Sequence, residues 1–194
     1  MKARQGVLAL AIAGLAAGCA VAAPTETQTH PQSQTAPVAA PQPTESNPPG
    51  DIPDDTVFVT YRPPGQPYEV KVPEGWARTD LPTGAGFTDK LNSVRVETKA
   101  AAAPPTAASV RNQIHSGDIR TIDTVTRKGG QAVRIVYRAD SSPDPVTGKV
   151  VRDEIERYLF YRSGREAILT LSGPVGADNV DPWRTVSDSF RWVP

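Results

Sequence analysis

The sequence predicts an α+β domain, in which a mostly antiparallel, twisted β-sheet of about six to seven strands carries two main packed helices. Several segments alternate apolar and polar residues with period two, which is typical of strands that bury one face. Short turn-forming segments join neighbouring strand candidates, and such connections favour antiparallel pairing. Two further segments combine a helix cap with an apolar stripe at helical spacing. Together these patterns indicate a layer of helices on a sheet.

The strand pattern is clearest where Val, Ile and Tyr alternate with charged residues. Tyr68, Val70 and Val72, for example, are separated by single charged residues. Turns at 129–130 (Gly-Gly) and 163–164 (Ser-Gly) then reverse the chain between strand candidates. The seven predicted strands cover residues 56–62, 68–72, 94–99, 119–126, 133–138, 155–161 and 167–171.

Two helices are predicted from capping residues and apolar spacing. The first begins after the N-cap Thr106 and runs to about His115, and Gly117 can end it. The second begins with Asp181 as its N-cap and Pro182 in its first turn. The apolar stripe that packs this second helix on the sheet is formed by Trp183, Val186 and Phe190.

Residues 1–18 have the three parts of a signal peptide. Lys2 and Arg4 form a basic head, the uncharged segment 6–18 is shorter than the roughly 20 residues that span a bilayer, and small residues precede Cys19. The exit sequence Leu-Ala-Ala-Gly-Cys resembles the lipobox of bacterial lipoproteins, although that family prefers leucine one position closer to the cysteine. The resemblance implies that Cys19 carries diacylglycerol and, after cleavage, an acylated amine such as a palmitoyl amide. The alternatives are an ordinary secretory signal with an incidental cysteine and an uncleaved membrane anchor.

The segment 19–55 is predicted to be a disordered tether. It contains eight prolines and has no aromatic residue, lysine or arginine. Such a composition buries too little apolar surface to offset its ordering entropy, and the prolines favour extended, solvated backbone. We therefore expect a signal peptide at 1–18, a lipidated Cys19 with its tether to residue 55, and a folded domain at 56–194.

Composition argues against several classes of function. Basic and acidic residues number 21 each, so no net field attracts nucleic acid. With two histidines and one cysteine, no metal site is expected, and neither a cofactor nor a catalytic set is expected. His115, Ser116 and Asp118 include the three triad residue types, but sequence neighbours rarely face one another as a triad requires. The segment 84–86, Gly-Ala-Gly, is interpreted as a turn, because no third glycine or helix signal follows.

Three surface features each have two interpretations. Six arginines either form a patch for an anionic envelope lipid or polymer, or pair across strands with neighbouring acids. The polar segment 139–150 is either a partner-contact loop or a mobile hairpin tip. Three tryptophans either line a pocket or belong to the core. The arginines are Arg134, Arg138, Arg152, Arg157, Arg162 and Arg165, the acids are Asp153, Glu154, Glu156 and Glu166, and the tryptophans are Trp76, Trp183 and Trp192.

Two motifs frame the predicted domain. In 68–76 a strand leads into Pro-Glu-Gly-Trp, and the closing segment 186–192 contains a Ser-Phe motif. With the order of the elements between them, these motifs resemble the Mog1/PsbP-like fold, as found in the LpqN-type lipoproteins of actinobacteria. The resemblance covers about 56–194 and implies a non-enzymatic docking or binding domain. It transfers no functional residue, because the matched positions are structural.

The sequence therefore predicts a monomeric cell-envelope lipoprotein that is anchored in the cell membrane through Cys19. It presents a non-catalytic binding or adaptor domain on the extracytoplasmic face, with envelope proteins or lipid as partners. The alternative is a carrier that holds a lipid or small apolar ligand between the sheet and the C-terminal helix. A large apolar cavity beneath Trp183 and Phe190 would favour the carrier, whereas a packed core with a flat exposed face would favour the adaptor.

Overall fold

The computed structural model describes residues 49–194, so the predicted signal peptide and Cys19 lie outside the described residues. Seven strands form the large sheet: β3 (Ala77–Leu81), β4 (Gly84–Asp89), β5 (Asn92–Ala100), β6 (Asp118–Arg127), β7 (Gly130–Asp140), β8 (Arg152–Arg162) and β9 (Arg165–Pro174). Three strands form the small sheet: β1 (Phe58–Tyr61), β2 (Tyr68–Pro73) and β10 (Arg191–Trp192). The helices are α1 (Ala107–Arg111) and α2 (Val180–Ser189).

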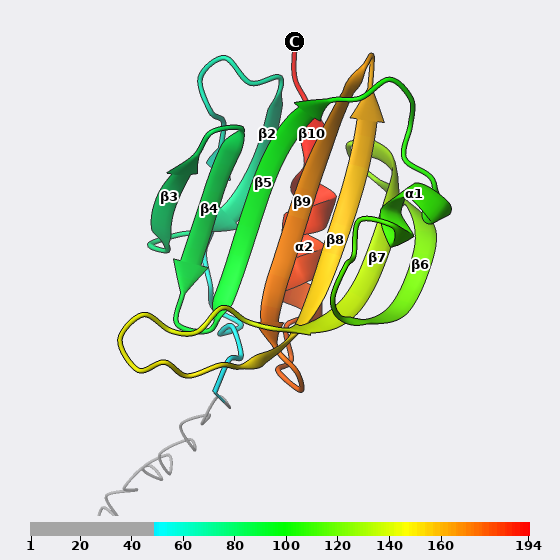
Figure 1. The fold of residues 1–194 in the computed structure, drawn as a ribbon. Coiled ribbons are helices and arrows are strands. Elements are labelled where there is room, and N and C mark those ends of the chain that lie inside the picture. The colour runs from blue at the N-terminus through cyan, green and yellow to red at the C-terminus, as the bar shows by residue number, and fades with distance from the viewer. Residues whose placement is uncertain (1–48) are drawn as a thin grey trace, which may run out of the picture. The chain divides into compact units, whose positions relative to one another are not determined.

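Both sheets are antiparallel throughout, with the strand orders β3-β4-β5-β9-β8-β7-β6 and β1-β2-β10. In Figure 1, α2 and the small sheet lie behind the large sheet, whereas α1 lies at its β6–β7 end. We call the side of the large sheet that faces α2 and β2 the inner face, and the opposite side the outer face. The predicted fold class, an antiparallel α+β domain with two helices, is confirmed.

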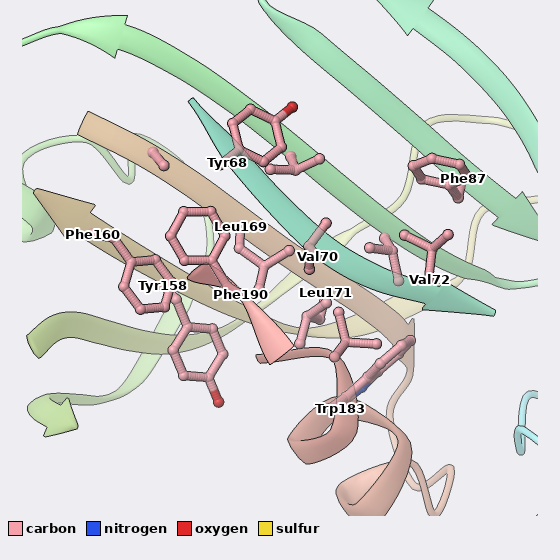
Figure 2. Packing of buried hydrophobic residues seen from close by; sticks show 14 of the residues in the cluster. Tyr68, Val70, Val72, Phe87, Tyr158, Phe160, Leu169, Leu171, Trp183 and Phe190 are labelled. Atoms are coloured by element: carbon pink, nitrogen blue, oxygen red, sulfur yellow. The ribbon is translucent and has the colours of Figure 1, made fainter. Parts of the chain in front are cut away.

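The main core lies between the inner face and α2 with the small sheet. Val96 on β5 and Leu169 on β9 are completely buried there. The ring centroid of Phe190 lies 4.3 Å from that of Phe160 and 5.9 Å from that of Tyr68. Figure 2 shows these side chains in the core. Because each of these side chains is removed from water, the cluster supplies a large part of the hydrophobic stabilisation.

A second, smaller core lies on the outer face beneath α1. Val110 of this helix is completely buried and packs with apolar residues of β7 and β8. The predicted N-cap is confirmed, because the Ser109 amide donates to Thr106 Oγ1 over 3.1 Å. The helix ends at Arg111, earlier than predicted, since the amide of Ile114 bonds to the carbonyl three residues back and tightens the chain.

The interpretation of residues 84–86 as a turn is wrong, because they form the first half of β4. The glycine at position 84 is explained by the neighbouring strand β5. A Cβ atom at Gly84 would lie 1.8 Å from the Val96 carbonyl oxygen, so glycine is required for the close approach of β4 to β5. Strand β3 was also missed, because most of its residues are exposed and it lacks the apolar alternation of a half-buried strand.

Helix α2 begins two residues earlier than predicted and has a different N-cap. Its N-cap is Asn179 rather than Asp181, and the Asn179 side chain makes no capping bond. Its amide nitrogen donates instead to the Gly50 carbonyl and to Asn92 Oδ1, over 3.0 Å each. The predicted apolar stripe is confirmed, since Trp183 and the two other stripe residues are buried.

The same two asparagines fix the start of the domain. The Ile52 amide donates to Asn179 Oδ1 over 2.8 Å, and the Asn92 amide donates to the Gly50 carbonyl over 2.8 Å. Ile52 itself is buried in the main core. We call these contacts of Asn92 and Asn179 the asparagine latch. Gly50 to Ile52, which the sequence assigned to the tether, are therefore packed against the domain.

Candidate functional site

The outer face of the large sheet is open over β4, β5 and β9. Helix α1 contacts β6 and β7, and Figure 1 shows no element in front of the three neighbouring strands. Small and polar side chains alternate with buried ones along these strands, so the outward-facing residues are mostly short. This outer polar face consists of Gly84, Gly86, Thr88, Ser93, Arg95, Thr170 and Ser172.

A row of charged groups crosses this face. Strand register places Arg95 on β5, Thr170 on β9 and Arg157 on β8 directly beside one another. The Arg95 guanidinium donates two hydrogen bonds to Glu97, of 2.5 and 2.9 Å, and this bonding lowers the pKa of that carboxyl against the opposing effect of burial. The Arg157 guanidinium lies 5.8 Å from the centroid of the Tyr137 ring. Glu97 is the ion-pair partner of Arg95, and the charge of Arg157 also lowers the pKa of the Glu97 carboxyl.

A pocket of about 230 Å³ borders the outer polar face, between the β4–β5 turn and the loop 141–151. Its lining includes Asp153, which is 9% exposed and accepts a 2.9 Å hydrogen bond from Ser172 Oγ. Burial raises the pKa of Asp153, and this hydrogen bond partly opposes the shift. The loop 141–151 begins two residues later than the predicted segment 139–150, because β7 continues to Asp140, and it extends to the residue before Arg152. Asp144 holds it by accepting two backbone hydrogen bonds.

The six arginines do not form a single patch. Three of them make ion pairs across strands: Arg134 with Asp123, Arg138 with Glu154, and Arg152 with Asp140. Cross-strand pairing is therefore confirmed for these three, although two of the partners differ from the acids that we predicted. The other three separate, with Arg157 on the outer face and Arg162 and Arg165 beside the β8–β9 turn.

The tryptophans belong to the core, as one interpretation predicted. Trp183 is 6% exposed, and Trp76 and Trp192 pack partly buried against the main cluster. The pocket beside Trp183 has a volume of about 50 Å³, whereas typical ligand sites have roughly 300–1,000 Å³. Phe190 is completely buried. The pocket beside Trp183 is therefore too small for the ligand that the carrier function requires.

The structure does not assemble the three triad residue types. His115, Ser116 and Asp118 are all exposed, and Asp118 pairs with Arg120 over 2.9 Å. Within residues 49–194 no cluster of three or more His, Cys, Asp or Glu side chains is arranged to hold a metal ion. Neither helix of this part has the length and hydropathy needed to cross a bilayer.

Comparisons with known proteins agree with this architecture. No protein-family model matches the chain, and no curated protein matches it significantly. Among solved structures, cyanobacterial PsbP (CyanoP) from Synechocystis has a TM-score of 0.52 and 16% identity, over 74% of this chain and 98% of that one.

Three further structures have lower TM-scores. The Ran-binding protein Mog1p of Saccharomyces cerevisiae has a TM-score of 0.48 and 10% identity, over 71% of this chain and 96% of that one. LpqN of Mycobacterium tuberculosis, which is involved in cell envelope biogenesis, has a TM-score of 0.42 and 12% identity, over 72% and 94%. A protein from Bacteroides thetaiotaomicron has a TM-score of 0.48 and 10% identity over 70% of this chain, which spans only 48% of its length. The likeness to CyanoP shows the fold, and the domain therefore has the Mog1/PsbP-like architecture.

Proposed function

We propose that this chain is a cell-envelope lipoprotein, anchored in the cell membrane through Cys19, whose domain is non-catalytic. The domain binds an envelope protein through the outer polar face, on the extracytoplasmic side of the membrane. One observation carries the proposal: the inner face of the sheet is packed, whereas α1 lies at the β6–β7 end of the outer face, which is open over β4, β5 and β9. The lipobox-like sequence before Cys19 supports the anchor.

The shape and charge of the outer polar face suit a protein partner. Flat surfaces of this kind are matched by other protein surfaces more readily than by small molecules, which bind in concave sites. The outer face has two neighbouring guanidinium groups, those of Arg95 and Arg157, but the single carboxylate of Glu97 beside them. Arginine is also enriched at protein interfaces. The partner surface is therefore flat, with carboxylates that complete the row.

The position of the asparagine latch also supports this arrangement. Gly50 is held at Asn92, the first residue of β5, so the chain that leads to Cys19 leaves from one end of the sheet. The outer polar face lies along the sides of the strands and stays free. The tether predicted between Cys19 and the domain would keep the domain near the membrane.

An in-cell crosslinking experiment with the full chain tests the proposal. Thr88→Arg places a bulky charged side chain on the outer polar face, and Thr185→Arg makes the same change on the exposed side of α2. We expect defined envelope proteins to be recovered with the unchanged chain and with Thr185→Arg, but not with Thr88→Arg. Cys19→Ser should release the protein from membranes and also abolish recovery.

Other outcomes of this experiment would overturn the proposal. Equal recovery with both threonine variants would exclude the outer polar face as the binding surface. If a lipid copurified in stoichiometric amount and no protein did, the carrier function would replace the adaptor. Membrane retention of the Cys19→Ser variant would contradict the lipid anchor.

A further inference from the structure

We infer that the end of the domain opposite the asparagine latch binds an anionic carbohydrate. Two adjacent pockets lie there, with volumes of about 530 and 390 Å³, and Gln66 lines both. We call them together the distal pocket. Each volume is within the range of roughly 300–1,000 Å³ that is typical of small-molecule sites. The inference concerns a second surface and does not depend on the proposed protein partner.

Strand β5 relates the distal pocket to the rest of the domain. Its first residue, Asn92, belongs to the asparagine latch, and its last residue, Ala100, lines the larger of the two pockets. A strand of this length extends for roughly 27 Å. The distal pocket is therefore at the far end of the sheet from the segment that leads to Cys19.

The charge around the distal pocket is positive. Arg62, Lys99 and Arg165 line it, and its lining contains no acidic residue. Lys99 is held 3.0 Å from the buried carboxylate of Glu166. None of the ion pairs within residues 49–194 involves Arg62 or Arg165. These two guanidinium groups are therefore available to an anionic ligand.

Arg162 and Arg165 give the most direct indication of an anionic ligand. Strand register places them directly opposite each other at the β8–β9 turn. Like charges in this position repel and destabilise the hairpin. The structure supplies no ion-pair partner for Arg162 within residues 49–194. A phosphate or carboxylate group bound beside the turn would relieve the repulsion and accept charge-assisted hydrogen bonds.

The remaining lining groups suit sugar hydroxyls. Thr83, Thr98 and Ser163 contribute hydroxyl groups, and Gln66 contributes an amide. Thr98 is 5% exposed and donates a 2.9 Å hydrogen bond to Gln66 Oε1, which orients that amide. A ligand with both hydroxyl and anionic groups would satisfy this lining.

Two tight turns form walls of the distal pocket. The loop 62–67 contains three prolines. The backbone amide of Gln66 donates a 3.3 Å hydrogen bond to the Pro63 carbonyl and so closes a turn, in which Gly65 has a φ of +72°. On the other side, Ser163 and Gly164 have φ values of 49° and 79°, as in a tight hairpin turn. Preformed walls reduce the entropy lost on binding.

The distribution of exposed apolar side chains favours a soluble carbohydrate over a lipid surface as the ligand of the distal pocket. None of the large aliphatic side chains exposed within residues 49–194 lines the distal pocket. They are Val57, Val59, Leu91, Val146, Val150, Val175 and Val180. Insertion of this end into a bilayer would therefore gain little apolar burial.

Calorimetric titration of the full chain, held in nanodiscs of neutral lipid, tests the inference. The probes are a polygalacturonate oligomer and inositol hexakisphosphate, with neutral dextran and phosphatidylglycerol vesicles for comparison. We expect binding of both anionic probes and weak or no binding of dextran. Arg165→Glu should weaken binding by about tenfold or more, since a charge-assisted hydrogen bond contributes about that factor. Lys149→Glu, the same charge change at the opposite end, should change the affinity less than about twofold.

Arg162→Glu separates binding from folding. It replaces the repulsion with an ion pair to Arg165, so we expect an unchanged or higher melting temperature together with weaker binding of both anionic probes. Equal affinity of Arg165→Glu and the unchanged chain would overturn the inference, as would an equal loss in Lys149→Glu. Tighter, Arg165-dependent binding of phosphatidylglycerol vesicles would replace the carbohydrate with a lipid surface. Loss of protein partners in the Thr88→Arg variant would leave this result unaffected, so the two proposals can fail separately.

Discussion

The two faces of the large sheet are built from the same strands but differ in what covers them. On the inner face, residues such as Val94 and Leu171 are completely buried beneath α2 and the small sheet. On the outer face, α1 covers the β6–β7 end, and Arg95 and Thr170 stay accessible on the neighbouring strands. Because side chains alternate along each strand, one face can stabilise the fold while the other is free for binding.

The largest expected effect concerns the inner face. Phe190→Ala removes a completely buried ring that lies on Phe160, so we expect the free energy of unfolding to fall by about 3–5 kcal/mol. Urea unfolding followed by circular dichroism measures this change. Thr185→Ala, on the exposed side of α2, is the control and should change stability by less than about 0.5 kcal/mol. A loss below about 1 kcal/mol for Phe190→Ala would show that the inner face is not the main core.

A smaller effect is expected at the covered end of the outer face. Val110→Ala deletes two methyl groups from the second core, and we expect a loss of about 1–2 kcal/mol in the same unfolding experiment. Ala108→Gly, on the exposed side of α1, controls for changes in helix propensity. If Val110→Ala destabilised the domain as much as Phe190→Ala, the two cores would have equal weight and the comparison would fail.

The acid dependence of stability tests the charged row on the open part of the outer face. The pKa of Glu97 is lowered by its hydrogen bonds from Arg95, so its stabilising contribution is present above the unfolded value and is lost as the pH falls through the lower folded value. Because the pair is partly exposed to solvent, which screens it, this contribution is under about 1 kcal/mol. Glu97→Gln should therefore reduce the urea midpoint slightly at pH 7, and the difference should vanish in acid. A difference that persisted at low pH would point to lost packing instead.

The contribution of Asp153 to stability should depend on pH with the opposite sign to that of Glu97. Burial raises its pKa, so the ionised carboxylate opposes folding, and this cost grows as the pH rises from the unfolded pKa through the folded one. An asparagine can still accept the hydrogen bond from Ser172. We therefore expect Asp153→Asn to raise the melting temperature slightly at pH 7 and to have no effect in acid. A lower melting temperature at pH 7 would mean that the carboxylate itself stabilises the loop 141–151.

The sequence predicts the fold where a pattern is local. Alternating strands such as β2 and β7 and the apolar stripe of α2 follow directly from residue spacing. Strand β4 was missed because the need for Gly84 comes from the Val96 carbonyl on the neighbouring strand. The N-cap of α2 was missed because the Asn179 amide binds Gly50, which is 129 residues away in the sequence.

The candidate site also depends on contacts between segments that are distant in the sequence, which residue spacing does not predict. The outer polar face depends on register, which places Arg95, Thr170 and Arg157 side by side from three separate strands. The distal pocket likewise combines a loop near residue 65 with a hairpin near residue 164. Neither juxtaposition has a signal in the local sequence, although Arg157, Arg162 and Arg165 were among the arginines singled out as candidates for binding an anion.

Site-specific photo-crosslinking in cells tests the central claim most directly. A photo-crosslinking amino acid replaces Thr88 on the outer polar face of the full chain, or Thr185 on α2 as the control. We predict that position 88 gives a defined protein adduct that disappears with Cys19→Ser and that position 185 gives none. Protein adducts from position 185 alone, or only lipid adducts from position 88, would contradict the claim that the uncovered face of the sheet binds an envelope protein.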